Sequence, residues 1–367
     1  MKILLFDNSS ITPRDGDYSC EPKTGQFATD LLELGNEITM YGQMVKAVDT
    51  IHVYKLKEKG IRVVGLYRRK NKLINYILLY LRAIPEVIKS DFVYVFYPNA
   101  FKYIICICIL LRKKYGLYIR GQNSLNNKYS HYIYKRAYTV FTVSDFFSDF
   151  VNNISKKVIA NTIRPMTPFN EKDILIDRDY QFKNKYRILY LGRVAFDKGI
   201  EELLQAIKTL KDKNYQFTLT IVGNGEFYQE AKKISDKLDI NDIVFFNGSE
   251  FKPEKIRNYY IESDIYILPT YHEGFPRTLY EAMIFGTPII TTFVGGIPGL
   301  MKDGFNCKEI KPKSIESIVE KLEFAFNNYP EMIGYAKNGF NTVAKIVDSK
   351  RLSHAESLNK KINGQKS

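Results

Sequence analysis

Short apolar runs alternate with segments of helical spacing along the whole chain, and this alternation limits the possible fold. In the first half the runs cover residues 2–6, 38–41, 61–66, 92–97, 117–119, 140–143 and 158–159. A second series covers residues 186–191, 217–222, 243–246, 264–268 and 289–292. Strands that alternate with helices favour parallel sheets in an α/β fold. Because the chain has 367 residues and the series restarts, we expect two domains.

The restart at residue 186 suggests where the domains end. We place an N-terminal domain at residues 1–165, a polar linker at 166–185, a C-terminal domain at 186–350 and a tail at 351–367. Residues 8–23 are expected to form a polar loop before a helix that opens at Thr24-Gly25. Helical spacing from residue 333 to 362 predicts that the chain ends in helix.

Basic residues are concentrated in the first half of the chain. Residues 1–165 hold 25 Lys and Arg against 13 Asp and Glu, whereas the remainder holds 29 against 27. This asymmetry predicts an anionic partner for the first half, either nucleic acid or an acidic membrane surface. No recognisable nucleic-acid module is present, so we expect no nucleic-acid partner.

A basic cluster at residues 67–72 leads into residues 73–88, which have aromatic and aliphatic side chains at helical spacing. This pattern is typical of a helix that lies on a membrane surface. A surface helix packed on the sheet with a solvated basic edge explains it equally well. No apolar run approaches the ~20 residues that span a bilayer, so we expect a protein that is soluble or peripheral to a membrane.

Cysteine usage fits a reducing compartment. The chain has four Cys, none in a C-x-x-C pair, and four His, so a structural zinc site is not expected. Residues 1–6 are too short for a signal peptide. We therefore expect a cytoplasmic protein, at the inner face of the membrane if the basic half binds lipid.

Two carboxylates follow the apolar run 264–268. Glu273 is expected in a turn, and Glu281 lies seven intervening residues later, in a helix pattern at 277–285. Gly274, Phe275 and Pro276 break the chain between them, with Pro276 expected in the first turn of that helix. A helix N-terminus at a sheet edge suits a phosphate, and carboxylates accept hydrogen bonds from hydroxyls. The stretch suits a ligand that has both phosphates and sugars.

Gly192-Arg193 ends the run 186–191, and Lys198 follows just before a helix pattern. An Arg and a Lys placed there can bind the oxygens of a phosphate-containing ligand. Two D-x-D strings, Asp15–Asp17 and Asp177–Asp179, lie in expected loops, and we interpret them as accidental rather than as metal ligands. No metal and no cofactor is expected.

The motifs together resemble the retaining family 4 glycosyltransferases (glycosyl transferases group 1), which have the GT-B fold. The residues that carry the resemblance are the Glu273–Glu281 pair, Gly192-Arg193 with Lys198-Gly199, Gly223 and Gly225 of V-G-x-G, the strand end at Asn247-Gly248, and the turn at residues 295–298. The family implies two Rossmann-like domains with parallel sheets facing across a cleft. It also implies a C-terminal helix that crosses back to the N-terminal domain.

The resemblance also implies roles for these residues. Arg193, Lys198 and Glu273 are expected to be catalytic, Glu281 to bind the ribose, and Gly192, Gly223, Gly225, Asn247, Gly274, Phe275 and Pro276 to line the donor site. Gly25 and Arg120 are assigned to the acceptor side. Arg120 stands where many relatives have His, and Gly299 where relatives have Glu. Arg120 can hold an anionic ligand or serve as a structural ion-pair partner.

The resemblance implies an enzyme that moves a hexose-type sugar from a nucleotide diphosphate donor to a glycan acceptor, with retention of configuration. The basic first half indicates a lipid-linked acceptor, as in the synthesis of capsule, O-antigen or related surface polysaccharides. Two alternatives are a non-catalytic GT-B scaffold and a GT-B enzyme of other chemistry, a phosphorylase or a sugar-nucleotide epimerase.

Overall fold

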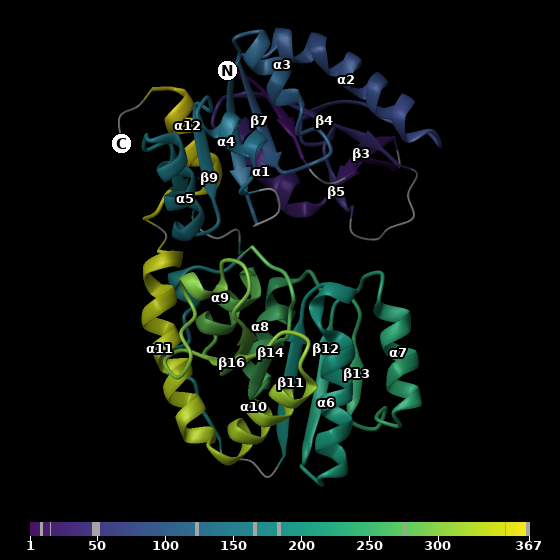
Figure 1. The fold of residues 1–367 in the computed structure, drawn as a ribbon, viewed down its shortest axis with the longest axis vertical. Helices are drawn as coiled ribbons and strands as arrows, with labels where there is room; N and C mark the ends of the chain where they lie inside the picture. The colour runs from purple at the N-terminus through teal and green to yellow at the C-terminus, as the bar shows by residue number, and fades with distance from the viewer. Residues whose placement is uncertain are drawn as a thin grey trace. The chain divides into compact units, whose positions relative to one another are not determined.

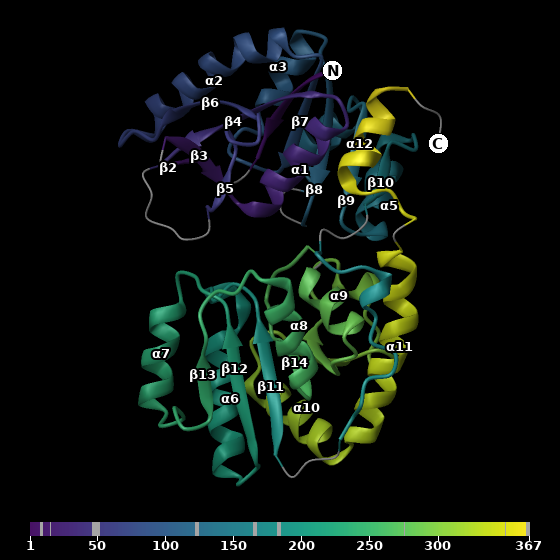
Figure 2. The same cartoon turned by 180° about the vertical axis from the view of Figure 1, so that it is seen from behind.

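The computed structural model describes residues 1–7, 10–14, 16–45, 52–121, 125–163, 167–181, 185–274, 276–348 and 350–364. The chain divides into two compact units, Met1–Arg164 with Leu352–Ser367, and Pro165–Arg351. Each unit is built on a parallel sheet with helices on both faces (Figures 1 and 2).

The first sheet has its parallel strands in the order β10-β9-β8-β7-β1-β4-β6. The strands are β1 (Lys2–Phe6), β4 (Glu37–Met44), β6 (Arg62–Tyr67), β7 (Phe92–Tyr97), β8 (Lys114–Ile119), β9 (Thr139–Thr142) and β10 (Ala160–Thr162). From β1 the chain adds β4 and β6 on one side, then β7 to β10 on the other. β7 is buried along its whole length, as expected for a parallel strand covered on both faces.

Helices cover both faces of this sheet. One face packs against α2 (Lys72–Lys89), α3 (Ile104–Leu110), α4 (Lys128–Tyr134) and α5 (Asp145–Ser155), which share one core. The opposite face carries α1 (Pro22–Glu33) and the C-terminal helix α12 (His354–Ile362), which pack against each other. The last helix of the chain therefore completes the first unit.

His354 anchors α12 to the sheet. Its side chain is buried, its ring stacks on Phe27 with 4.3 Å between ring centroids, and its Nε2 lies 2.6 Å from the Tyr94 hydroxyl. Burial, and secondarily the charge of Arg120, lower the pKa of His354 to about 3. The histidine is thus held neutral among aromatic rings.

The polar loop expected at residues 8–23 is wrong in part. It contains β2 (Thr12–Arg14) and β3 (Asp17–Cys20), which form a small antiparallel sheet with β5 (Tyr54–Lys55). The helix after it begins at Pro22 rather than at residue 24. Strands this short and polar carry no alternating apolar pattern that a sequence could reveal.

The second sheet has its parallel strands in the order β13-β12-β11-β14-β15-β16. The strands are β11 (Tyr186–Leu191), β12 (Phe217–Val222), β13 (Val244–Phe246), β14 (Ile265–Leu268), β15 (Ile289–Thr292) and β16 (Lys308–Ile310). The helices are α6 (Ile200–Asp212), α7 (Tyr228–Lys237), α8 (Pro253–Glu262), α9 (Arg277–Ile284), α10 (Ile315–Asn327) and α11 (Tyr329–Val347), with short 3₁₀ turns at Glu171–Asp173, Phe196–Lys198 and Ile297–Gly299.

Arg178 fastens the segment before β11 to the rest of the second unit. Its guanidinium donates to the carbonyl oxygens of Tyr260 and Ile261 near the end of α8, and of Ser263 just after it, at 2.5–3.1 Å. It also donates to the Phe285 carbonyl at 2.7 Å, directly after α9. One cation thus caps two helix C-termini, where carbonyls lack partners and the dipole favours positive charge.

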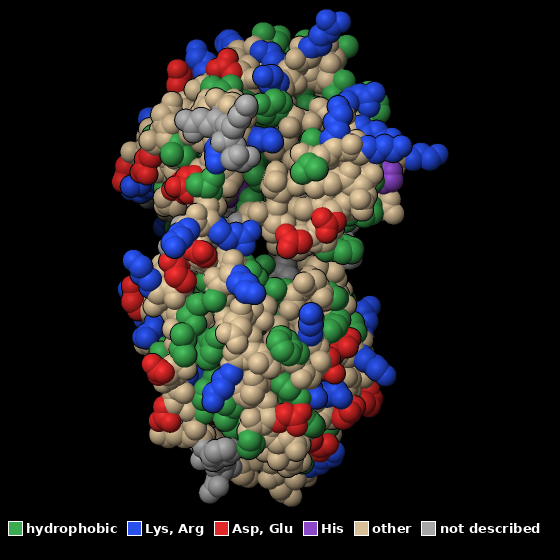
Figure 3. Space-filling view, turned by 90° about the vertical axis from the view of Figure 1, so that its left-hand side faces the viewer, with side chains coloured by type: hydrophobic (Ala, Val, Ile, Leu, Met, Phe, Trp, Pro, Cys, Tyr) green, Lys and Arg blue, Asp and Glu red, His purple; other side chains and the backbone are tan. Residues whose placement is uncertain are grey.

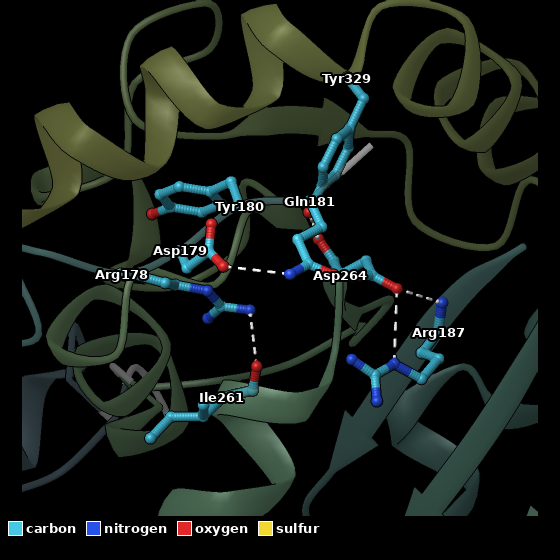
Figure 4. A pocket seen from close by; sticks show the side chains of 8 residues that line it. All are labelled: Arg178, Asp179, Tyr180, Gln181, Arg187, Ile261, Asp264 and Tyr329. Carbon is cyan, nitrogen blue, oxygen red and sulfur yellow. Dashed lines mark hydrogen bonds and ion pairs between the residues drawn. The ribbon is translucent and has the colours of Figure 1, made fainter. Parts of the chain in front are cut away.

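Figure 4 shows this guanidinium pointing at Ile261, beside a cavity of about 160 Å³. Asp179 lies next to Arg178, and its carboxylate accepts a hydrogen bond from Gln181 at 3.1 Å. The second D-x-D string therefore lies in the segment before β11 that Arg178 holds against α8 and α9. Asp15 of the first string is outside the described residues.

The strand predictions at residues 2–6, 92–97, 186–191, 217–222 and 289–292 are confirmed without a shift. The strand expected at 158–159 is wrong by two residues, since the strand β10 begins at Ala160. The Asn152 side chain accepts hydrogen bonds from the backbone N–H groups of Ile159 and Ala160, and so holds the chain where it enters β10. The C-terminal helical stretch is divided, with α11 ending at Val347 and α12 starting at His354. Among the described residues no helix has the length and apolar character needed to cross a bilayer.

Candidate active site

The order of the second sheet creates a switch point between β11 and β14. From β11 the chain adds β12 and β13 on one side, and then β14, β15 and β16 on the other. Connections on the two sides leave a crevice at the carboxyl ends of the two central strands, which is where ligands bind in open α/β sheets. Arg193 lies in the loop after β11, one residue beyond Gly192, and Glu273 lies in the loop after β14.

Lys198 and Glu273 form an ion pair in this crevice. The side chain of Lys198 is 10% exposed and that of Glu273 is 20% exposed. The Lys198 ammonium also donates to the His272 carbonyl at 3.1 Å and to the Thr270 hydroxyl at 3.4 Å. The ammonium is therefore surrounded by oxygens, and its position relative to the Glu273 carboxylate is fixed.

Asp197 joins Arg193 to this pair. Its carboxylate lies 3.1 Å from the Arg193 guanidinium and 3.6 Å from the Lys198 ammonium. Arg193 also lies 3.4 Å from Glu226, and its side chain is 55% exposed. The Tyr190 hydroxyl donates to the Arg193 carbonyl at 2.7 Å and so fixes the backbone that carries the guanidinium. The structure thus brings together Arg193, Lys198 and Glu273, with a half-exposed arginine beside a shielded lysine.

The glycines at the strand ends allow two loops to touch. Gly223 has a φ of +147°, and a Cβ there would lie 1.8 Å from the Gly192 carbonyl oxygen. A Cβ on Gly225 would lie 2.4 Å from the Val194 carbonyl oxygen. Any side chain at these positions would push the loop after β12 away from the loop that carries Arg193.

The loop of Glu273 rests on the turn that follows β15. The Gly296 N–H donates to the Gly274 carbonyl at 2.6 Å, and a Cβ on Gly295 would lie 1.7 Å from the Glu273 carbonyl oxygen. Pro276 is the N-cap of α9 and not part of its first turn, so that expectation is wrong by one residue. Phe275 lies outside the described residues.

Glu281 is buried in α9, with 1% of the residue exposed. Its carboxylate accepts hydrogen bonds from the Thr167 hydroxyl at 3.3 Å and the Tyr260 hydroxyl at 3.2 Å. The Arg277 guanidinium lies 3.8 Å away. Burial raises the pKa of Glu281, and Arg277 and the two hydroxyls oppose that rise. Glu281 therefore has hydroxyl partners of its own, separate from the Lys198–Glu273 pair.

Asn247 follows β13, at the outer edge of the same sheet. Its backbone N–H donates to the Ile221 carbonyl at 2.9 Å, and its side-chain amide donates to the Tyr259 hydroxyl at 3.1 Å. The residue is exposed. It lies at the carboxyl end of its strand, as Arg193 does, two strands away.

Gly25 and Arg120 lie in the first unit. Gly25 is inside α1, and a Cβ there would lie 2.2 Å from the Tyr54 ring, so the absence of a side chain lets that ring pack on the helix. Arg120 follows β8, forms an ion pair with Asp7 at 3.6 Å and lies over the Phe96 ring at 5.2 Å. One interpretation of Arg120 was a structural ion-pair partner, and this ion pair, with Asp7, is present.

Sequence reasoning missed Asp197 and the two hydroxyl partners of Glu281. Asp197 had a local signal, because it directly precedes Lys198 in the same turn. Thr167 and Tyr260 had no local sequence signal, since they are far from Glu281 in the sequence. Within the described ranges no group of three or more His, Cys, Asp or Glu could hold a metal ion.

A family model matches the part of the chain that contains this site. Residues 173–342, which include Arg193, Lys198, Glu273 and Glu281, match the family described as Glycosyl transferases group 1. The glycosyl transferases group 1 region thus contains every strand of the second sheet.

Curated relatives align with part of this chain. An uncharacterized glycosyltransferase of Haemophilus influenzae is 35% identical over 185 residues, which cover 49% of this chain and 47% of the relative. The amylovoran biosynthesis glycosyltransferase AmsK of Erwinia amylovora is 35% identical over 146 residues, which cover 37% of this chain and 35% of AmsK. The chain thus spans half or less of the length of these two relatives.

Solved structures align over the whole chain. The crystal structure of HepE from Anabaena in complex with UDP-glucose superposes with a TM-score of 0.67 at 16% identity, and covers 99% of this chain and 98% of HepE. The fold of the chain is GT-B, as expected from the glycosyl transferases group 1 motifs.

Proposed function

We propose that this chain is a retaining glycosyltransferase of family 4 that moves a hexose from a nucleotide diphosphate sugar to a glycan acceptor without a metal ion. The observation that carries the proposal is the grouping of Arg193, Lys198 and Glu273 at the switch point of the second sheet. Two cations and a carboxylate at one crevice match the charges of a donor that has a diphosphate and a hydroxylated sugar.

The cations act on the leaving group. When the bond between the sugar and the diphosphate breaks, negative charge accumulates on the diphosphate oxygens. Arg193 and Lys198 are held before the reaction by Asp197 and Glu273, so little reorganisation is needed as that charge develops. Because these cations neutralise the diphosphate, the proposed reaction needs no divalent ion.

The remaining donor contacts follow from the site. Glu273 would accept hydrogen bonds from sugar hydroxyls, and the backbone of residues 274–276 before α9 would bind phosphate or sugar oxygens. Glu281 would accept from the ribose hydroxyls, which are the same kind of donor as the Thr167 hydroxyl that it accepts from at 3.3 Å. Gly192, Gly223, Gly225 and Asn247 line the carboxyl edge on which the nucleotide would lie.

The acceptor is assigned to the first unit. Its excess of basic residues suits a lipid-phosphate-linked glycan at the cytoplasmic face of a membrane, and Arg120 at a strand end would contact an anionic group on it. AmsK is named for amylovoran biosynthesis, and we infer a related role for this chain in bacterial surface polysaccharide synthesis, as in capsule or O-antigen.

Nucleotide binding tests the proposal most directly. Calorimetric titration with UDP, GDP and ADP in the presence of EDTA is expected to show binding of one of them, and UDP is the first candidate because HepE was crystallised with UDP-glucose. Lys198→Met is expected to weaken that binding, whereas Lys208→Met, on the exposed side of α6, is not.

The reaction product distinguishes the proposed sugar transfer from a phosphorylase or epimerase reaction. The anomeric coupling constant of the transferred sugar, measured by NMR, is expected to show the same configuration as the donor. Absence of binding for all three nucleotides would refute the donor site. Sugar phosphate or an epimerised donor as the product would instead identify a phosphorylase or an epimerase.

A further inference from the structure

Helix α2 has apolar side chains on both its inner and its outer face. The inner residues Leu79, Ala83 and Val87 are fully buried against the sheet. On the outer face Leu73, Ile77 and Leu81 are 73%, 50% and 57% exposed, and they are spaced four residues apart, so they lie on one side of the helix. Ile74 and Ile88 are also exposed. We call Leu73, Ile74, Ile77, Leu81 and Ile88 the outer stripe.

Helix α3 adds exposed apolar surface close to this helix. It packs beside α2, and the Tyr103 N–H at its start donates to the Tyr80 hydroxyl of α2 at 3.3 Å. Tyr103 and Leu110 are 53% and 81% exposed. Single exposed apolar residues are ordinary on a protein surface, but several on two adjacent helices mark an interaction site.

Cations gather at the N-terminal end of the outer stripe. A cavity of about 580 Å³ at the carboxyl ends of β4 and β6 is lined by Met44, Val45, Tyr67, Arg68, Arg69, Lys70 and Lys72. The Arg69 N–H donates to the Asn75 side chain at 3.0 Å, which ties the basic cluster to the first turns of α2. We call Arg68, Arg69, Lys70 and Lys72 the basic cluster.

The basic cluster and α2 carry almost no compensating acid. Between residues 68 and 89 the one acidic residue in the sequence is Glu86, and both its oxygens bind the Arg62 guanidinium, at 2.5 and 3.0 Å. No acidic side chain in the described part of the chain pairs with the basic cluster. Figure 3 shows a different face of the first unit, the upper half of the view, on which basic, acidic and hydrophobic side chains are interspersed.

The geometry points to a docking surface for an anionic lipid bilayer, in which the outer stripe lies at the boundary of headgroups and acyl chains and the basic cluster binds lipid phosphates. Apolar side chains along a helix with cations at its end are the two features that binding to such an interface requires. Nucleic acid would leave the outer stripe without a partner, and an apolar protein partner would leave the basic cluster without counter-charge. The inference rests on the proposed function only in placing the acceptor at a membrane.

Co-sedimentation of the full chain with vesicles tests this surface without any turnover. We expect pelleting with vesicles in which phosphatidylglycerol replaces part of the phosphatidylcholine, and none with phosphatidylcholine alone. Pelleting should decrease at high salt, because the exposed charges are screened. Each cation near an anionic surface contributes roughly fivefold in affinity, so Arg68→Gln/Arg69→Gln/Lys70→Gln should weaken binding on the order of 100-fold.

A matched control separates the effect of the basic cluster from the effect of the net charge of the chain. Lys232→Gln/Lys233→Gln/Lys237→Gln on α7 removes the same net charge from exposed lysines and should bind as the wild type does. Leu73→Ser/Ile77→Ser/Leu81→Ser changes exposed residues, so it should keep its thermal melt and lose binding. Equal weakening in the control and the basic-cluster variant, or undiminished binding of the outer-stripe variant, would overturn the inference.

Two further outcomes separate the docking surface from a protein interface and from the proposed function. Wild-type chain that fails to pellet with anionic vesicles but self-associates through the outer stripe would show that the surface is a protein interface, and would also overturn the inference. Nucleotide binding by the same preparation reports on the proposed function separately. Wild-type chain that binds nucleotide but does not bind anionic vesicles therefore refutes the docking surface and leaves the transferase proposal standing.

Discussion

The ammonium of Lys198 lies against the carboxylate of Glu273, although 75 positions separate these residues in the chain. The contact joins the loop after β11 to the loop after β14, across the switch point of the second sheet. The two opposite charges compensate each other in a site that is largely closed to water. A ligand that enters the crevice meets an ion pair that is already assembled.

Glu273→Gln is expected to lower the transfer rate by ~100-fold, because it removes both the hydroxyl acceptor of the site and the anion that positions Lys198. The unfolding free energy should fall by about 1–3 kcal/mol, since a shielded ammonium loses its partner. Initial rates and thermal melts measure the two effects. Glu226→Gln is the matched control, because Glu226 is an exposed partner of Arg193, and an equal loss of rate in this control would contradict the assignment.

Glu281 should make the stability of the second unit depend on pH. Burial raises its pKa above the ordinary value of 4.5, so the folded chain binds this proton more tightly than the unfolded chain. The stability that Glu281 contributes is therefore complete below pH 4.5 and is lost as the pH rises through the raised pKa. Melting temperatures of wild type and Glu281→Gln should diverge in this direction, with the wild type losing relative stability toward higher pH. A constant difference across the series would contradict this.

Arg178→Met should destabilise the second unit by several kcal/mol, because it removes the donor to the Ile261, Ser263 and Phe285 carbonyls at the ends of α8 and α9, and each such loss costs about 1–3 kcal/mol. Arg187→Met is the comparison, since Arg187 is 45% exposed and makes an ion pair with Asp264 at 3.6 Å. Urea denaturation measures both variants. Similar midpoints for the two would show that the guanidinium of Arg178 does not fasten these helices.

His354 should make the first unit sensitive to acid. Its pKa is lowered from 6.5 to about 3, so the unfolded chain binds a proton that the folded chain rejects between these values. Stability should therefore fall as the pH falls from 6.5, by at most ~1.4 kcal/mol per pH unit. His354→Gln keeps a polar partner for Tyr94 but does not titrate, and should show a shallower loss. His131→Gln on α4, outside this aromatic cluster, is the matched control for urea denaturation at each pH.

The strands could be predicted because parallel strands covered on both faces must be apolar throughout. β7 is such a continuous run, β11 and β12 are mostly apolar, and β15 is half apolar; each of the four was found at its predicted bounds. The small sheet of β2, β3 and β5 could not be predicted in this way. Its stability comes from pairing with a strand some 35 residues later, as in the contact of Cys20 with Tyr54, and no local pattern encodes that partner.

The site was predictable where its residues belong to one local motif. Arg193 and Lys198 share a turn, and the structure joins them through Asp197. The surroundings of Glu281 were not predictable, because Thr167 and Tyr260 reach it from other segments and only the packed structure shows that its carboxylate is buried. The same holds for Gly25, whose close neighbour Tyr54 comes from the small sheet.

The attachment of α12 to the first unit has a consequence for biosynthesis. A ribosome delivers the sheet of this unit first, then the whole of Pro165–Arg351, and the covering helix last. Until His354 emerges, Phe27 and Tyr94 lack the ring that seals them. The unit that is translated first is thus the last to be finished, and its aromatic surface must be kept from aggregating while the rest of the chain is made.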